Sequence, residues 1–137
     1  MLANGATLGY KESPEAVDYT ILPGLKEIPE IGNNPEKVDN TCLDDKVKQY
    51  ENGIGDAGDM VYKFKYDNTK ADSPYRKLRE LEAAGKKVSF CETTADGTRA
   101  EFDAQVSVKR NSAGVNGVIE FEASMALQSE IRITDPA

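Results

Sequence analysis

Two long stretches near the C-terminus alternate between apolar and polar residues, and this pattern restricts the possible folds more than any other feature of the chain. Because successive side chains of a strand point to opposite faces of its sheet, each stretch predicts a strand with one buried and one solvated face. In residues 98–110 the apolar positions are Phe102, Ala104, Val106 and Val108. In residues 118–130 they are Ile119, Phe121, Ala123, Met125 and Leu127.

The solvated faces of these two predicted strands are rich in carboxylates. The polar positions are Glu101, Asp103, Gln105, Ser107 and Lys109 in the first stretch, and Glu120, Glu122, Ser124 and Gln128 in the second. We therefore expect an antiparallel ribbon with an apolar underside and an acidic upper face.

The connection between the two strands is compatible with two turns. A four-residue loop at 111–114 sets Arg110 opposite Val115, whereas a tight Asn-Gly turn at 116–117 sets Val115 opposite Val118. Both turns place an even-numbered residue opposite an odd-numbered one. Both therefore keep the apolar residues of the two strands on one face, and the choice between the turns stays open.

One helix is predicted, over residues 73–84. Ser73 is a suitable N-cap, Pro74 suits the first helical position, and Gly85 suits the left-handed conformation that ends a helix. A narrow apolar stripe predicts that the helix lies on the sheet with its outer side in water. The stripe consists of Tyr75, Leu78, Leu81 and Ala84.

Shorter strands are predicted before and after this helix. Their positions are Thr7–Tyr10, Asp18–Leu22, Leu25–Ile31, Asp59–Tyr66 and Lys86–Glu92. Pro29 cannot donate to a ladder, so Leu25–Ile31 should lie at an edge or break there. A three-residue loop at 95–97 sets Phe90 opposite Phe102, which a two-residue turn would not do. The elements do not alternate strand with helix, which indicates a mainly antiparallel β fold with one flanking helix.

Residues 32–58 form a long polar segment in which only Glu36–Val38 and Thr41–Leu43 resemble strands. A segment of this length is uncommon in a small domain unless it has a function of its own. Its few apolar residues give little burial to offset the entropy of ordering it, so we expect it to become ordered against a neighbour.

Composition excludes several classes of protein. A net charge of -7 argues against a module that binds duplex DNA, which needs clustered cations. The chain has no histidine, and Cys42 and Cys91 form no zinc-binding motif. It has no apolar run that could span a bilayer and no N-terminal signal segment, so we expect a soluble protein made in a reducing cytoplasm.

No motif predicts catalysis, a metal or a cofactor. Residues 53–58 match GxGxxG, but they lack the preceding hydrophobic strand and following helix that a dinucleotide site requires. The adjacent Asp44 and Asp45 lack the ligand spacing of a calcium loop. The carboxylate pairs Glu120 with Glu122 and Glu101 with Asp103 have no nucleophile or histidine beside them, so we interpret them as a solvated strand face.

The order of these parts resembles the major tail tube proteins of long-tailed, siphovirus-like bacteriophages over nearly the whole chain. The matching segments are an extended N-terminal segment (6–22), a strand (25–31), the long loop EKVDNTCLDDKVKQYENGIGDAGD, the aromatic strand MVYKFKYD, the helix SPYRKLRELEAAG, and the closing strands VSFCE, TRAEFDAQVSV and GVIEFEASM. The most specific piece is LDD followed by a glycine-containing loop and an alternating strand. Some members carry an extra C-terminal domain, which we do not expect here.

The resemblance implies one β-sandwich or partial-barrel domain over residues 1–137, with a flanking helix. Its parts would be an N-terminal arm (1–24), an inter-ring loop (32–58), the helix (73–84) and the C-terminal strands (86–133). The lumen would be lined by Glu101, Asp103, Gln105, Ser107, Glu120, Glu122 and Ser124. The contacts between rings would come from Leu43, Asp44, Asp45, Lys46, Val47, Tyr50 and Ile54.

The implied function is structural. Six copies would form a ring, and stacked rings would form a conduit for DNA and the tape-measure protein, with tail terminator and distal tail proteins as further partners. The protein would be part of the virion, assembled in the host cytoplasm, with no enzymatic activity, cofactor or membrane. Three alternatives remain: a monomeric β-barrel that binds a ligand or a partner, a secretion-system tube protein, and a head-tail connector.

Overall fold

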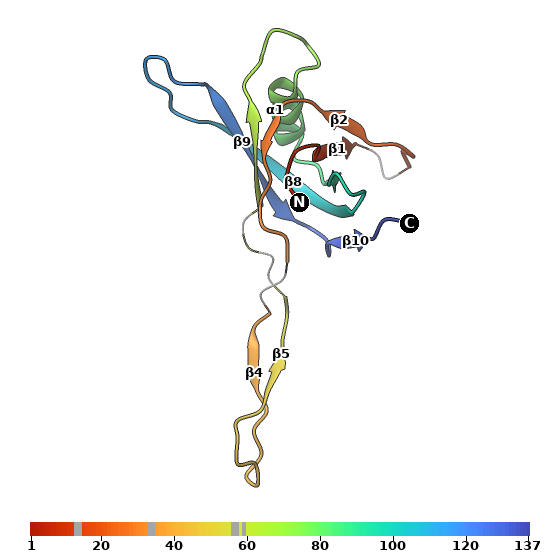
Figure 1. Ribbon diagram of the computed structural model, residues 1–137, viewed down its shortest axis with the longest axis vertical. Coiled ribbons are helices and arrows are strands. Elements are labelled where there is room, and N and C mark those ends of the chain that lie inside the picture. Colours follow the sequence, from red (N-terminus) through yellow and green to blue (C-terminus); the bar gives the residue numbers. More distant parts are fainter. Residues whose placement is uncertain (13–14, 33–34, 56–57, 59) are drawn as a thin grey trace.

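The body of the protein is an antiparallel sheet of eight strands, organised around the long strand β8 (Arg99–Arg110). This computed structural model describes residues 1–12, 15–32, 35–55, 58 and 60–137 (Figure 1). The strand order is β2-β1-β7-β8-β9-β6-β3, and β10 also pairs with β8. The other strands of the sheet are β1 (Thr7–Lys11), β2 (Thr20–Leu22), β3 (Leu25–Glu27), β6 (Met60–Lys65), β7 (Val88–Thr93), β9 (Glu120–Leu127) and β10 (Arg132–Thr134).

This architecture confirms the expected fold class, a mainly antiparallel β protein with one helix. The sheet is not closed into a barrel, because β2 and β3 lie at its two ends without a further partner among the described strands. β3 stops at Glu27, before Pro29, and occupies an edge as predicted. Within the described residues, no helix is long and apolar enough to cross a membrane.

The alternation of β8 and β9 places their apolar residues on one face, as the sequence predicts. Phe102, Ala104, Phe121 and Ala123 are all fully buried, because these side chains point into the space that the sheet and helix enclose. Ile119 is an exception, since it precedes β9 and is 42% exposed.

Neither predicted turn joins β8 to β9. Val106 lies opposite Met125, and the ladder closes where the Asn111 N–H donates to the Glu120 carbonyl at 2.9 Å. Residues 112–119 therefore leave the ladder as a longer loop, which turns internally at Asn116 with a φ of 62°. No core lies beside this end of the ribbon to hold the loop residues in the ladder. The predicted parity still holds, since even-numbered residues face odd-numbered ones.

Aromatic stacking between distant parts of the sheet forms the core. Tyr62 of β6 stacks on Phe102 of β8, with ring centroids 6.4 Å apart, and Phe90 of β7 stacks on Phe102 at 5.8 Å. β6 and β7 are separated by β8 and β9 in the strand order, so their side chains can meet on Phe102 only if the sheet curls over its own apolar face. Phe64 of β6 also stacks on Phe121.

The helix α1 (Pro74–Ala84) has the predicted ends. Ser73 is its N-cap residue, and Gly85 ends it in the left-handed conformation with a φ of 63°. Leu78 and Leu81 are buried against the sheet as predicted. Ala84 is exposed, so the apolar stripe is shorter than the sequence indicates.

The hairpin between β7 and β8 has the predicted three-residue loop. Phe90 lies opposite Phe102, and the Thr94 N–H donates to the Thr98 carbonyl at 3.0 Å. Gly97 adopts a φ of 95°, which favours glycine at the end of such a turn. The register follows from packing, because it places the two phenylalanines together in the core.

A second, two-stranded sheet projects from the body as a long hairpin (Figure 1). It consists of β4 (Lys37–Asp39) and β5 (Tyr50–Asn52). The predicted strand at Thr41–Leu43 is wrong. There the Asp39 carboxylate accepts hydrogen bonds from the Thr41 N–H and hydroxyl, which bends the chain into a local turn. The first residue of the predicted strand Asp59–Tyr66 lies outside the described residues.

Phe102 provides a test of the packing described here. Phe102→Ala removes a ring that stacks on both halves of the sheet, so we expect a loss of about 3–5 kcal/mol in the free energy of unfolding. Chemical denaturation of the subunit measures this loss. Ser107→Ala, on the exposed face of the same strand, is the control and should change stability by less than about 0.5 kcal/mol. Equal effects of the two substitutions would contradict the assignment of faces.

Candidate functional site

The polar face of β9 carries paired charges of both signs. Glu122 lies between Lys63 of β6 and Lys109 of β8, its direct neighbours in the two ladders. Glu120 lies opposite Lys65, and its carboxylate accepts a hydrogen bond from the Lys26 ammonium at 2.5 Å. The face that the sequence predicts to be acidic therefore also carries lysines from neighbouring strands. The lysines come from strands whose place beside β9 is a property of the tertiary structure.

Glu101 and Asp103 belong to a different part of the same sheet. Glu101 lies opposite Cys91 of β7 and accepts a hydrogen bond from the Tyr19 hydroxyl at 3.1 Å. Asp103 accepts a hydrogen bond from the Ser89 hydroxyl at 2.7 Å. Four carboxylates that alternate along two strands are thus divided into two groups, one beside β6 and one beside β7.

The register also removes a like-charge contact that the four-residue turn would create. That turn places Asp103 opposite Glu122, but the Gln128 N–H donates to the Asp103 carbonyl instead. Between the two groups of carboxylates, Ser107 lies opposite Ser124, and Gln105 lies opposite Ala126. Uncharged side chains thus separate the two groups of carboxylates along the ribbon, which avoids like charges directly across a ladder.

The surroundings of Glu120 and of Tyr19 shift the pKa values of these two side chains in opposite directions. The hydrogen bond from Lys26 lowers the pKa of the exposed Glu120 carboxyl. Burial, together with the neighbouring Glu101 carboxylate, raises the pKa of the Tyr19 hydroxyl to about 12. Glu120 therefore stays ionised and Tyr19 stays neutral at neutral pH. These groups form charge pairs and hydrogen bonds.

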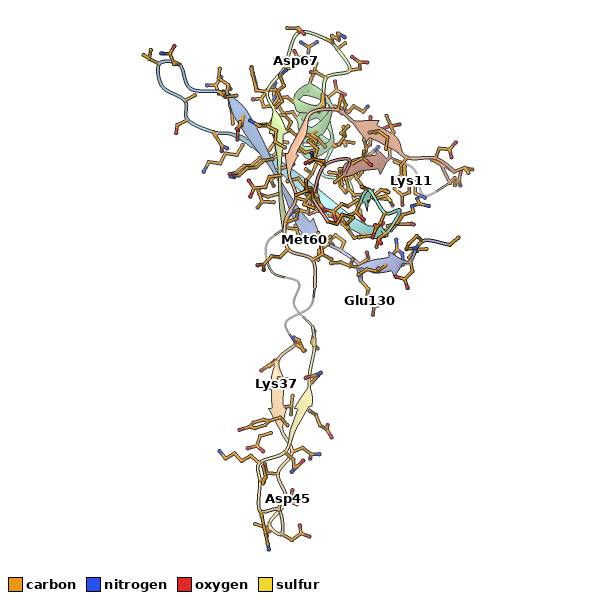
Figure 2. The ribbon with its side chains drawn as sticks, viewed as in Figure 1. Lys11, Lys37, Asp45, Met60, Asp67 and Glu130 are labelled. Carbon is orange, nitrogen blue, oxygen red and sulfur yellow. The ribbon has the colours of Figure 1, made fainter. Side chains whose placement is uncertain are left out.

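The residues expected to join rings all lie on the projecting hairpin, where every one of them is exposed (Figure 2). Tyr50 lies opposite Asp39 in the β4–β5 ladder, and the Ile54 carbonyl accepts a hydrogen bond from the Glu36 N–H. The others surround the tip of the hairpin. They are Leu43, Asp44, Asp45, Lys46 and Val47. We call residues 43–47 the hairpin tip.

The described part of the GxGxxG match belongs to this hairpin. The Gly53 N–H donates to the Glu36 carbonyl, which places Gly53 at the base of the β4–β5 ladder. Asp56 and Ala57 of the match lie outside the described residues. Across the described residues, no three histidine, cysteine, aspartate or glutamate side chains group as metal ligands would.

The chain matches a model of a known protein family. A model described as phage tail tube, TTP, lambda-like matches residues 1–128. The chain belongs to this family of phage tail tube proteins. No curated protein matches the chain. The protein is therefore a structural component of the virion tail and has no enzymatic role. This assignment excludes the alternative of a monomeric ligand-binding barrel.

Solved structures share the fold of this tail tube protein at low sequence identity. The tail of an empty gene transfer agent particle, refined with C6 symmetry, matches with a TM-score of 0.70 and 19% identity, over 93% of this chain and 95% of that chain. The virion of a native gene transfer agent particle matches with a TM-score of 0.71 and 17% identity, over 98% of both chains. The SPP1 tail tube matches with a TM-score of 0.57 and 11% identity, over 96% of this chain and 77% of that chain.

The core of this tail tube protein contains a buried carboxylate that was not predicted from the sequence. Glu92 of β7 is 5% exposed and lies near the fully buried Tyr62. Neither the Glu92 Oε1 atom nor the Tyr62 hydroxyl makes a hydrogen bond of normal geometry among the described residues. The alternation of the strand indicates its burial, because Glu92 and the apolar residues Val88 and Phe90 occupy alternate positions and therefore share one face of the sheet.

Glu92 should make the stability of the subunit depend on pH. Burial raises the pKa of its carboxyl, and the nearby Tyr62 hydroxyl offsets part of this rise. Because the pKa of Glu92 is raised in the folded state, the folded subunit is most stable below the pKa of glutamate in the unfolded chain, about 4.3. This stability is lost as the pH rises through the pKa of Glu92 in the folded state. We expect Glu92→Gln to melt at a higher temperature than the wild type at pH 7.

Thermal melts from pH 4 to pH 8 measure this difference. The advantage of Glu92→Gln over the wild type should shrink towards pH 4, where the wild-type carboxyl is protonated in both states. Glu82→Gln, on the exposed side of α1, is the matched control and should show no such pH-dependent gain. A constant difference across the pH range would show that ionisation of Glu92 is not its cause.

Proposed function

We propose that six copies of this tail tube protein form a ring, and that stacked rings form the conduit through which the genome is delivered. The observation that carries the proposal is the projecting hairpin on a tail tube fold whose sheet has two open edges. The C6 symmetry of the gene transfer agent tail, whose fold this chain shares, supports six copies in a ring.

The open edges of the sheet supply a means of joining neighbours within a ring. β2 and β3 end the strand order, and residues 23–24 join them, so the two free edges lie close together in the subunit. The outer side of each strand has no partner strand among the described residues and presents unpaired N–H and C=O groups. Pairing of one subunit's edge with the next would continue the sheet around the ring. A ring closed in this way leaves no edge exposed to aggregation, which is a reason for a structural protein to assemble through its strands.

The polar face of the sheet is our candidate for the wall of the lumen. The lining residues in this proposal are Glu101, Asp103, Gln105, Ser107, Glu120, Glu122 and Ser124. Lys26, Lys63 and Lys109 on the same face each have a glutamate as a bonded or directly opposite partner. A neighbouring carboxylate weakens the attraction of each of these lysines for phosphates, so the wall should hold DNA only loosely. DNA and the tape-measure protein would pass without specific binding.

The hairpin is our candidate for the contact between rings. Leu43, Val47 and Ile54 are 108%, 71% and 88% exposed, a set of apolar side chains that the subunit itself does not cover. An exposed group of this kind marks an interaction surface. Burial against the adjacent ring would remove these side chains from water and would order the hairpin.

The domain organisation follows from the same proposal. Residues 1–137 would act as one domain, comprising an N-terminal arm (1–24), the inter-ring hairpin (32–58), the helix (73–84) and the C-terminal strands (86–133). The tube would assemble in the cytoplasm of the bacterial host and would end at the tail terminator and distal tail proteins.

Truncation of the hairpin tests the stacking of rings. Replacing residues 41–48 with Asn-Gly keeps the Asn40–Gln49 backbone pair and closes it with a tight turn. We expect the wild type to form tubes that lengthen with protein concentration, and the truncated variant to form rings that do not stack. Electron microscopy and analytical ultracentrifugation distinguish these species.

Circular dichroism of the truncated variant is the control for folding, since the body of the subunit does not depend on the hairpin tip. Truncated protein that still forms tubes of normal length would contradict the role of the hairpin. Wild-type protein that remains monomeric at every concentration and ionic strength would contradict the proposed function itself.

Removal of two carboxylates tests the lumen. Glu120→Gln with Glu122→Gln removes the carboxylates beside Lys26, Lys65 and Lys109, whereas Lys63 keeps its ion pair with Glu27. We therefore expect tubes of this variant to retain DNA at low salt and to release it as salt rises. Filter binding and a nuclease-protection assay measure retention. Glu80→Gln with Glu82→Gln makes the same change in net charge on the exposed side of α1 and should retain no more DNA than the wild type. Equal retention by the two variants would place the β9 face outside the lumen.

A further inference from the structure

A groove at the N-terminal end of α1 is not used by any contact described so far. It has a volume of about 720 Å³ and lies between the start of α1, β2 and residues 67–72. Its walls are largely apolar. They include Tyr10, Ile21, Leu22, Pro23 and Pro74. Ile21 is 53% exposed, so the groove has an apolar rim that is accessible from solvent.

The floor of this groove, which we call the α1 groove, presents hydrogen-bond donors without acceptors. Ser73 lines it, is only 5% exposed, and its hydroxyl has no hydrogen-bond partner among the described residues. Although Ser73 is the N-cap residue, its side chain makes no capping bond. The first turn of α1, fully described, contains no acidic residue, so its free N–H groups favour an incoming carboxylate.

Five charged residues line the α1 groove, and two of them, Lys70 and Asp72, lie two residues apart on its rim. Lys70 and Asp72 both line it, and among the described residues neither forms an ion pair. The other three already have partners. Lys77 is bonded to Glu12 at 2.6 Å and lies 3.8 Å from the Glu80 carboxylate, and the Asp67 carboxylate accepts hydrogen bonds from the Thr69 N–H and hydroxyl. A ligand that fits this rim needs an apolar side chain, a carboxylate and a cation at short spacing.

The hairpin tip has this combination. Leu43 is fully exposed, and it is followed by Asp44 and, two residues later, by Lys46. Neither of these two charged side chains forms an ion pair among the described residues, whereas the Asp45 carboxylate already accepts the Cys42 N–H. The spacing of Asp44 and Lys46 matches that of Lys70 and Asp72.

The two surfaces lie at opposite ends of the molecule. Figure 2 shows Asp45 at one end of the long axis and Asp67, which lines the α1 groove, at the other. Surfaces at opposite poles cannot meet within one chain, but they can meet between copies that repeat along the axis. A head-to-tail contact of this kind does not close on itself and therefore extends into a filament or tube.

We propose that the hairpin tip of one copy docks in the α1 groove of a second copy in the next ring. Leu43 packs against the apolar walls, the Asp44 carboxylate accepts from the Ser73 hydroxyl and pairs with Lys70, and Lys46 pairs with Asp72. This inference rests on the proposed stacking of rings and names the surface that receives the hairpin.

Disulfide trapping through a native cysteine tests the contact. Cys42 is exposed and adjoins the hairpin tip, whereas Cys91 is buried. Ala71→Cys places a thiol on the rim of the α1 groove. Disulfides form only between closely placed residues, so oxidation of assembled tubes should link successive copies into a ladder on a non-reducing gel.

Two matched variants control the trapping. Cys42→Ser combined with Ala71→Cys should give no ladder. Ala83→Cys, on the exposed side of the same helix, should give none with Cys42 present. Tubes that form normally while Ala71→Cys links no better than Ala83→Cys would overturn the docking site and leave the proposed function intact. Absence of tubes from the wild type would overturn both.

Charge reversal gives a second measurement that needs no cross-link. Lys70→Asp should reduce the fraction of protein in tubes severalfold, and adding Asp44→Lys should restore most of it, because the pair is re-formed with its signs exchanged. Lys87→Asp, an exposed lysine beyond the other end of α1, should have no such effect. If Asp44→Lys fails to restore assembly of the Lys70→Asp variant while both proteins remain folded, the proposed pairing is wrong.

Discussion

The packing of both halves of the sheet on Phe102 is the interaction on which the rest of the structure depends. Tyr62 and Phe90 come from strands that never pair with each other, yet both rings stack on this one residue of β8. The sheet must therefore curl over its apolar face, and α1 covers what the curled sheet leaves open. The opposite face of β8 is turned outward by the same alternation, so the core and the candidate lumen wall are two consequences of one pattern.

Charge on that outer face is controlled by which strands become neighbours. β9 contributes only carboxylates at its charged positions, but β6 and the end of β8 place lysines directly beside them. A channel for DNA benefits from this arrangement in a specific way. Unpaired cations would bind phosphates, and adjacent unpaired carboxylates would repel one another across the ladder. Neighbouring opposite charges reduce both effects, so the proposed wall would hold a polyanion less strongly than a wall of lysines alone.

Several features of the subunit are incomplete in a single copy. Within the part of the chain that the structure describes, two sheet edges lack partner strands, the hairpin tip exposes apolar side chains, and the buried Ser73 hydroxyl has no hydrogen-bond partner. Each feature costs free energy in an isolated chain, and each is resolved by another copy of the same chain in the proposed tube. A subunit whose unsatisfied groups are complementary to its own surfaces assembles with itself in preference to other proteins.

Local pattern and tertiary contact determined different parts of this protein. The alternation of β8 and β9, the ends of α1 and the β7–β8 turn could all be predicted from the sequence, because each depends on a period or on a residue that suits one backbone conformation. The β8–β9 loop, the hairpin strand at Tyr50–Asn52 and the pairing of Glu122 with Lys63 could not. Those features depend on which distant segments lie side by side, and that is decided by the packing of the core as a whole. Both kinds of information are needed for the buried Glu92. Its place on the apolar face of β7 follows from the alternation in the sequence, but only the curled sheet brings Tyr62 near it.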